Sequence, residues 1–184
     1  MVEFRHETDR LILRDWREQD WEPFWHYTNT PNVMRWLGSP LDKAGQKKQQ
    51  ERFLQYRREQ GHTFWVVERK DDSELLGCCG LKLSNLPPGP IGMMEVGWRL
   101  REDAWGKGYA KESAMASLDL AFGQFRADEV IAITLPENIP SWRLMERLGM
   151  RRRTDLDFVC DAFDPAGVFE IVYAITAEEW EKDK

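Results

Sequence analysis

The sequence predicts an α/β (α+β) fold, in which helices flank one mixed β-sheet. Strand-like and helix-like segments are mixed along the 184 residues, as expected when both pack on a common core. No repeat, low-complexity segment or linker divides the chain, so one domain spanning residues 1–184 is expected. The third observation is a strand that runs through a glycine-rich turn into a helix between residues 93 and 122.

Seven segments have the composition of β-strands, because β-branched and aromatic residues gather there between turn signals. The first of them sets apolar Leu11 and Leu13 against Arg14 and Asp15. The expected strands are 10–16, 62–69, 75–83, the first half of 93–110, 129–135, 152–161 and 168–176. Polar turns are expected at 70–73 and at 164–167.

Helices are expected at 18–27, 42–60, 106–122 and 138–149, with a short helical turn at 33–37 and a terminal helix from 176. The first carries Trp21, Phe24 and Trp25 at helical spacing. The second is largely polar and should end at Gly61, which can adopt the left-handed conformation of a C-cap. Asn138 is expected to cap the helix at 138–149.

Composition restricts the class of protein. The formal net charge of −6 argues against a nucleic-acid-binding surface. No apolar run approaches 18 residues and residues 1–7 are too polar for a signal peptide, so a cytoplasmic protein without a membrane span is expected. Three cysteines, two of them adjacent, do not suggest a disulfide framework. No metal site is expected, because the histidines and cysteines lack ligand spacing.

The segment 93–110 predicts a site for a phosphate-bearing ligand. Gly106 and Gly108 let the backbone approach a ligand without an intervening Cβ. The helix that follows offers free N–H groups and the positive end of its dipole. A P-loop would need glycine in place of Arg101, and a dinucleotide fingerprint would need glycine in place of Lys111. Neither of these motifs fits.

A set of motifs resembles the GNAT N-acetyltransferase superfamily, and more narrowly its RimJ/RimL-like branch, which modifies the N-termini of ribosomal proteins. WGKGYAKESA at 105–114 looks like the acetyl-CoA loop of that family. Segments similar to its opening strand, central strand and last cofactor-side helix stand at 8–14, 95–98 and 138–150. The resemblance covers nearly the whole chain, and the motifs are strong only in combination.

The resemblance implies a mostly antiparallel sheet of six or seven strands, in which the fourth and fifth strands splay apart to admit pantetheine. It implies an acetyl-CoA-dependent N-acetyltransferase that works by direct attack in a ternary complex. The acceptor would be a primary amine, either a protein N-terminus or a small molecule. Neither nucleic acid nor a membrane is expected as a partner, and the protein would be a monomer or a homodimer.

For the cofactor, the resemblance implies contacts from the loop and from the strands on both sides of the splay. Backbone N–H groups would lie at a bulge of the central strand, for which Gly97 is suited. Asp103 stands where the family has Gln or Arg, so the loop amides and Lys107 must bear more of the diphosphate. The expected cofactor residues are Trp98, Arg99, Leu100, Trp105, Gly106, Lys107, Gly108, Tyr109, Ala110, Asn138 and Ser141.

For catalysis, the resemblance assigns the general base to Glu95, whose alternative role is an ion-paired or solvent-facing strand carboxylate. The usual tyrosine acid is replaced by Met145, which cannot donate a proton. Ser141 or water would protonate the leaving thiolate instead, although Ser141 could also serve only the start of its helix. Trp25 and Trp36, together with Glu95, are the expected acceptor-binding residues, with core packing as their alternative.

A non-catalytic acyl-CoA-binding or regulatory module with the same fold is the rival function. The missing tyrosine and Asp103 favour that module, whereas the presence of Glu95 and Ser141 favours the enzyme. A cysteine nucleophile is not expected, because Cys78 and Cys79 lie in the middle of a predicted strand without a nearby basic partner.

Overall fold

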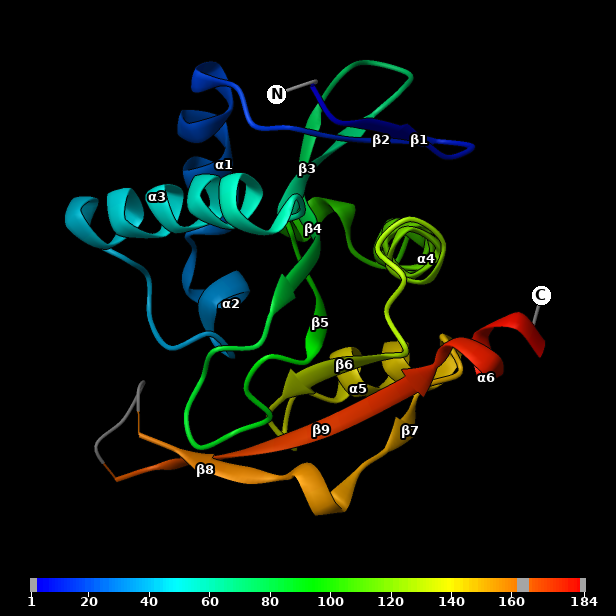
Figure 1. Cartoon of the computed structure of the whole chain (residues 1–184). Coiled ribbons are helices and arrows are strands. Elements are labelled where there is room, and N and C mark those ends of the chain that lie inside the picture. The colour runs from blue at the N-terminus through cyan, green and yellow to red at the C-terminus, as the bar shows by residue number, and fades with distance from the viewer. Residues whose placement is uncertain (1–2, 162–165, 183–184) are drawn as a thin grey trace.

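The computed structural model describes residues 3–161 and 166–182 (Figure 1). Its strands are β1 (Arg5–Glu7), β2 (Leu11–Arg14), β3 (Phe64–Arg69), β4 (Leu75–Leu83), β5 (Met94–Leu100), β6 (Glu129–Thr134), β7 (Arg151–Arg152), β8 (Phe158–Cys160) and β9 (Val168–Thr176). Its α-helices are α1 (Trp21–Thr28), α2 (Pro31–Met34), α3 (Lys43–Gln60), α4 (Tyr109–Gly123), α5 (Ile139–Arg147) and α6 (Ala177–Lys182). Three short 3₁₀ helices are η1 (Glu18–Asp20), η2 (Glu102–Ala104) and η3 (Thr154–Leu156).

The strands lie in the order β1-β2-β3-β4-β5-β6-β9-β7, and β8 pairs with the end of β9. The pairings are antiparallel except that of β5 with β6, which is parallel. The sheet is therefore mixed and mostly antiparallel, and helices flank it, as the sequence predicts.

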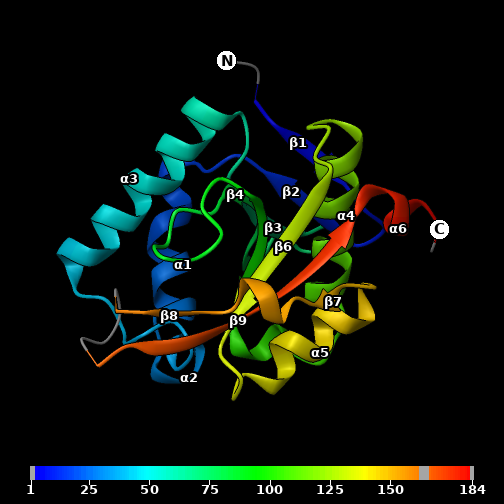
Figure 2. The same cartoon turned by 60° about the horizontal axis from the view of Figure 1, so that its bottom comes forward.

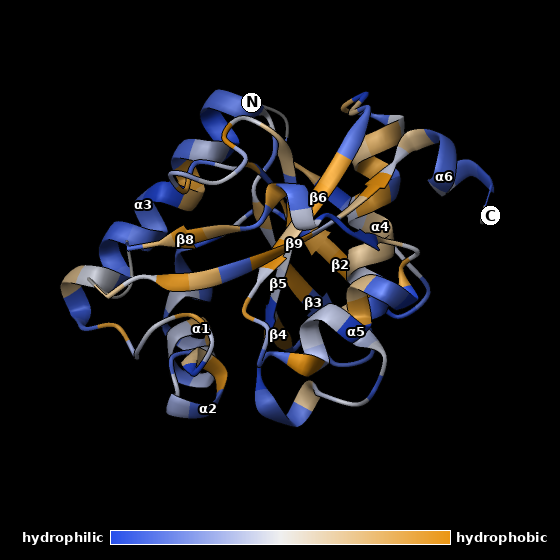
Figure 3. Ribbon diagram, turned by 90° about the horizontal axis from the view of Figure 1, so that it is seen from below, coloured by the Kyte–Doolittle hydropathy of each residue, from blue (hydrophilic) through white to orange (hydrophobic). Residues whose placement is uncertain are grey.

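Helices cover the sheet on two faces. Helix α4 and helix α6 lie on one side of the strands and helix α1 and helix α3 on the other (Figure 2). The largest apolar cluster joins the sheet to α4, α5 and α6 through residues such as Leu118, Met145 and Trp180. A second cluster under α1 and α3 includes Phe24 and Phe53. Apolar colour accordingly concentrates in the central strands, while α3 is mostly hydrophilic (Figure 3).

Helix α3 confirms its sequence prediction at both ends. The Asp42 carboxylate accepts a hydrogen bond from the Gly45 N–H at 2.8 Å, which satisfies one free amide of the first turn. Gly61 ends the helix with a φ of 76°, which glycine adopts without a Cβ penalty. Only Phe53 and Tyr56 of α3 are buried, as expected of a largely solvated helix. No helix in the described part of the chain is long and apolar enough to span a membrane.

The strand count exceeds the expected six or seven for two reasons. Strand β1 was not predicted, because Arg5–Glu7 is polar and short, yet it pairs with the edge of β2. The strand expected at 152–161 is divided by η3 into β7 and β8. At this interruption the Asp157 carboxylate takes the place of a backbone acceptor and receives the Val172 N–H at 3.0 Å.

Two helix starts also differ from expectation. Helix α4 begins at Tyr109 and not at 106, because Gly106 and Gly108 adopt positive φ angles of 72° and 84°. Asn138 precedes α5 but does not cap it; its side-chain amide donates to Thr134 Oγ1 at 2.9 Å. The turn expected at 164–167 lies partly outside the described residues, which omit 162–165.

Candidate functional site

Strands β5 and β6 separate after a short parallel pairing. Their register joins Met94 to Val130 and Glu95 to Ile131 and goes no further, whereas β5 stays paired with β4 up to Leu100. One edge of β5 therefore has no strand partner in the described part of the sheet beyond Glu95. The two ribbons diverge visibly from this point (Figure 1). This opening corresponds to the splay expected from the sequence.

The backbone of β5 directs alternate amides into the opening. The Arg101 N–H donates to the Leu76 carbonyl at 2.8 Å, so alternation turns the Arg99 N–H toward β4 as well. The N–H groups of Trp98 and Leu100 consequently face the opening. Two of the three amides expected to face the opening therefore do so. The Arg99 amide faces β4 instead, which corrects the expectation for that residue.

The bulge expected at Gly97 is absent, because the β4–β5 register runs without a shift from Leu83↔Met94 to Gly77↔Leu100. Gly97 has a packing role instead. A Cβ at this position would lie 3.0 Å from Cε1 of Phe64. The glycine thus admits the Phe64 ring against the face of the sheet.

The turn before α4 is open. Gly108 is the N-cap residue, and the first amides of α4 have no acceptor within the helix. A Cβ on Gly106 would meet no atom within 4 Å. The Trp105 indole is held at the end of β5, where its Nε1 donates to the Leu100 carbonyl at 2.8 Å. The turn therefore leaves free N–H groups at its surface, the arrangement that a site for a phosphate-bearing ligand requires.

Arg10 supports this turn, and the sequence argument assigned it no site role. Its Nη1 donates to the Lys107 carbonyl at 3.0 Å, and its Nε donates to Glu112 at 2.7 Å. The guanidinium lies 4.6 Å from the centroid of the Tyr109 ring. Arg10 stands in the quoted opening-strand motif, but sequence alone gives no sign that it reaches a turn almost one hundred positions away. The Lys107 side chain is exposed beside the same turn.

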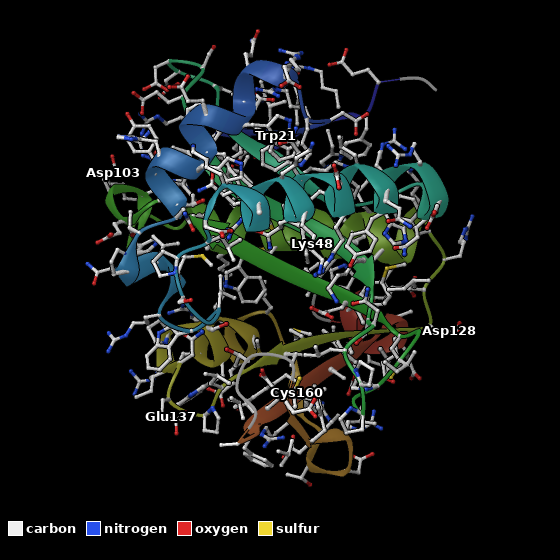
Figure 4. The ribbon with its side chains drawn as sticks, turned by 90° about the vertical axis from the view of Figure 1, so that its left-hand side faces the viewer. Trp21, Lys48, Asp103, Asp128, Glu137 and Cys160 are labelled. Atoms are coloured by element: carbon white, nitrogen blue, oxygen red, sulfur yellow. The ribbon has the colours of Figure 1, made fainter. Side chains whose placement is uncertain are left out.

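Asp103 pairs with a neighbour instead of facing a ligand. Its two oxygens accept from Arg101 Nε at 2.5 Å and Nη2 at 2.7 Å, and this pairing lowers the pKa of the Asp103 carboxyl. Arg101 also pairs with Glu74 at 3.0 Å and stacks on Tyr27. Figure 4 shows Asp103 at the margin of the molecule. Its charge is therefore balanced locally.

Glu95 lies on β5 at the last position before the opening. It faces Lys82 across the β4–β5 pairing and forms an ion pair with the Lys82 ammonium. Both side chains are largely buried, with 14% and 13% exposed, respectively. The expected base is thus held as an ion-paired strand carboxylate, which the sequence argument allowed as its alternative role.

A second carboxylate, Glu170, was missed. It lies on β9 opposite Phe158 of β8 and is only 6% exposed. Burial, followed by repulsion from Glu95, raises its pKa from 4.5 to about 7. In the sequence Glu170 is the one charged residue of the largely apolar segment 168–176, which indicates burial but gives no sign of the Glu95 charge that reaches it.

At the start of α5 the Ser141 N–H donates a hydrogen bond to the Asn138 carbonyl at 3.0 Å, which brings the two residues together. The Ser141 hydroxyl is partly exposed and makes no hydrogen bond with the described residues. Met145 is 1% exposed and belongs to the core, so no proton donor stands at that position.

The two tryptophans expected in an acceptor pocket are not brought together. Trp25 is 8% exposed and packs on Phe24, while Trp36 follows α2 and is partly exposed. Trp25 lines a surface groove between α1 and α3, to which Trp36 does not contribute. The Arg99 guanidinium lies 5.4 Å from the Trp25 ring and donates to Gln49 Oε1 at 3.1 Å. The side chain of Trp25 thus serves packing at this face.

Alkylation of the native protein should spare Cys78 and Cys79. Both thiols are buried in β4, and burial raises their pKa values, that of Cys79 to about 12. Because the thiolate is the reactive form, labelling by iodoacetamide at pH 7.5 should be roughly 100-fold slower than in denaturant. Peptide mass mapping under both conditions measures this, and equal labelling rates would contradict it.

Known proteins are similar to this chain in sequence and in fold. A family model described as the acetyltransferase (GNAT) domain matches residues 10–151. The Bacillus subtilis protein named uncharacterized N-acetyltransferase YnaD is 30% identical over 176 residues, which cover 94% of this chain and 97% of YnaD. An acetyltransferase structure from Agrobacterium tumefaciens superimposes with a TM-score of 0.80 at 23% identity, covering 95% of each chain. A GNAT-family acetyltransferase structure from Bacillus anthracis gives 0.78 at 26% identity, covering 95% of this chain and 99% of the other. The chain therefore belongs to the GNAT acetyltransferase family.

Proposed function

We propose that the chain is a single N-acetyltransferase domain, residues 1–184, which transfers the acetyl group of acetyl-CoA to a primary amine. The observation that carries this proposal is the placement of two sets of free backbone donors. The unpaired edge of β5 supplies one set, and the turn before α4 supplies the other. Bound acetyl-CoA would supply an activated thioester.

The residues of the turn fit a diphosphate. The amides of Gly106, Gly108, Tyr109 and Ala110 would bind its oxygens, since they lie at the positive end of α4. The Lys107 ammonium would add a positive charge. Asn138 and Ser141 at the start of α5 would contact the pantetheine arm across the opening. Trp105 would border this site, because its indole is fixed to the end of β5.

The opening also fits the chemistry of acyl transfer. The N–H groups of Trp98 and Leu100 would donate to the oxygen that becomes negative when an amine adds to the thioester. An amine is almost fully protonated at neutral pH and must lose a proton before it attacks. Glu95, the base expected from the sequence, faces this region but is engaged by Lys82. Ser141 or water would protonate the departing thiolate.

The acceptor is proposed to be a protein N-terminus, following the RimJ/RimL-like motifs, with a small-molecule amine as the alternative. Of the two expected tryptophans, the partly exposed Trp36 would border the acceptor side, since Trp25 is engaged in packing. The protein is proposed to act in the cytoplasm as a monomer or homodimer, without a nucleic-acid or membrane partner. The non-catalytic acyl-CoA-binding module is the competing function, and Met145, buried at the position where the resemblance implies a tyrosine acid, favours it.

The test is calorimetry with acetyl-CoA followed by a thiol-release assay over N-terminal peptides and small amines. Binding with amine-dependent release of CoA supports the enzyme. Tight binding without release from any amine supports the module, and no binding by folded protein refutes both.

Replacing Gly106 by valine should weaken acetyl-CoA binding by about 10- to 100-fold, because the loss of one or two hydrogen bonds to a charged group costs about that much. The new side chain would fill the open turn at a φ of 72°. Gly92→Val is a matched control, since Gly92 has a φ of 84° and also meets no atom within 4 Å. Calorimetry should show wild-type affinity for the control. Equal affinity for both variants would contradict the proposal that the turn at Gly106 binds the diphosphate.

A further inference from the structure

Glu170 has an environment that disfavours a charged carboxylate. Its side chain is 6% exposed and lies beside Phe158, to which it is paired across β8 and β9. No hydrogen bond or ion pair links it to the residues that the structure describes. A buried carboxyl without a partner reduces stability once it ionises, so its presence calls for an explanation other than packing.

The sheet register places Glu170 and Glu95 on one face. Glu95 is paired with Ile131, and Ile133 is paired with Val172. Residues directly paired across strands point to the same side, as do residues two apart on one strand. Glu95 and Glu170 therefore point to the same face of the sheet as Ile131, Ile133 and Val172.

The two carboxylates stand on opposite sides of the point where β5 and β6 part. Glu95 belongs to β5, which continues along one side of the opening, and Glu170 belongs to β9, which follows β6 along the other. Electrostatic repulsion from Glu95 reaches Glu170. Glu170 thus lies on the same face of the sheet as Glu95, on the strand beyond β6, where β5 and β6 have parted.

The neighbouring charges leave Glu170 without a cation. Lys82, on β4, is bound to Glu95. On the other edge of β9, Arg152 is bound to Asp157. Burial and the Glu95 charge together raise the pKa of Glu170 to about 7, so that near neutral pH it exists in both forms. A base with such a pKa is matched to proton transfer at neutral pH.

We propose that Glu170 is the general base of the transfer, and that Glu95, held by Lys82, is the charge that tunes it. This inference rests on the proposed acetyltransferase function and identifies the proton acceptor of that site.

A Glu170 carboxylate oxygen accepts one proton from the substrate ammonium, directly or through a water, and becomes a carboxylic acid. The freed nitrogen lone pair forms the C–N bond at the thioester carbon. When the C–S bond breaks, its electron pair stays on sulfur, which receives the second nitrogen proton by way of Ser141 or water. Glu170 then releases its proton to solvent.

The decisive experiment compares Glu170→Gln with Glu95→Gln, using the best amine found in the thiol-release panel. Glutamine mimics the protonated side chain, so the Glu170→Gln protein should fold. We expect kcat to fall by about 10²- to 10⁴-fold and the acid limb near pH 7 to disappear. Glu95→Gln should instead move that limb to lower pH, because it removes a like charge. Glu178→Gln, at an exposed carboxylate of α6, is the control and should match the wild type.

A second measurement does not depend on turnover. The pKa of Glu170 is higher in the folded than in the unfolded chain, so the fold binds the proton more tightly. Wild-type stability should therefore decline relative to Glu170→Gln as pH rises from 4.5 through about 7. Urea unfolding at a series of pH values tests this. If the free energies of unfolding of the two proteins changed in parallel with pH, the raised pKa of Glu170 would be refuted.

The outcomes separate the two proposals. Wild-type kcat with an unchanged acid limb in Glu170→Gln overturns the base assignment, as does loss of the limb in Glu95→Gln alone. Failure of the wild-type protein to release CoA with any amine overturns the acetyltransferase proposal itself.

Discussion

Replacing Asp20 by alanine is expected to lower the free energy of unfolding by about 3–5 kcal/mol, because it leaves a buried cation without its principal partner. Asp20 receives two hydrogen bonds from Arg14, at 2.7 and 2.9 Å, and the two side chains are only 6% and 5% exposed. Asp20 also accepts the Arg17 N–H at 2.7 Å. Glu68, at 2.7 Å from Arg14, remains as one compensating charge.

Urea unfolding followed by circular dichroism measures this loss. Glu178→Ala is the control, because its ion pair with Lys182 is exposed and should contribute little. A loss below about 1 kcal/mol for Asp20→Ala, within the range of exposed pairs, would show that the Arg14 charge is solvated when its partner is removed.

Replacing Gly77 by alanine should be comparably damaging. A Cβ there would lie 2.1 Å from the Arg99 carbonyl oxygen and 2.8 Å from the Leu100 Cα, and both of these are backbone atoms that cannot rotate away. The φ of 142° adds backbone strain. Overpacking and strain each cost about 1–3 kcal/mol, so we expect a loss of roughly 3–5 kcal/mol.

The same substitution should also disturb the site, because it separates β4 from β5 where Leu100 lies. Thermal unfolding and acetyl-CoA calorimetry measure the two effects. Gly123→Ala in α4 is the control: no atom lies within 4 Å of its added Cβ, and alanine suits a helix. A Gly77→Ala protein as stable as this control would mean that the two strands are not in close contact.

The elements predicted well were those specified by local patterns. Asp42 and Gly61 bound α3 because each acts on its own backbone within a few residues. Strand β1 was missed because its stability comes from pairing with β2, and the sequence of a polar tripeptide does not indicate such a pairing. Asn138 failed as a cap because Thr134, on the preceding strand, offers its side chain a competing partner.

The candidate site likewise contains features that could be predicted from the sequence and features that could not. The turn at Gly106 and Gly108 could be predicted because positive φ and free helix amides follow from the residues themselves. The environments of Glu95, Arg10 and Glu170 could not, since each depends on a contact made by strand pairing or by distant segments. Whether a carboxylate is paired, buried or repelled is decided by its three-dimensional neighbours.

The free edge of β5 has an evolutionary consequence. Its donors belong to the polypeptide main chain, so substitutions at Trp98 or Leu100 keep them unless the new residue is proline, which lacks the N–H. If these amides stabilise the developing charge as proposed, selection could diversify the residues that choose an acceptor while the donors stay in place. The specificity of such a scaffold could then be altered without rebuilding its chemistry.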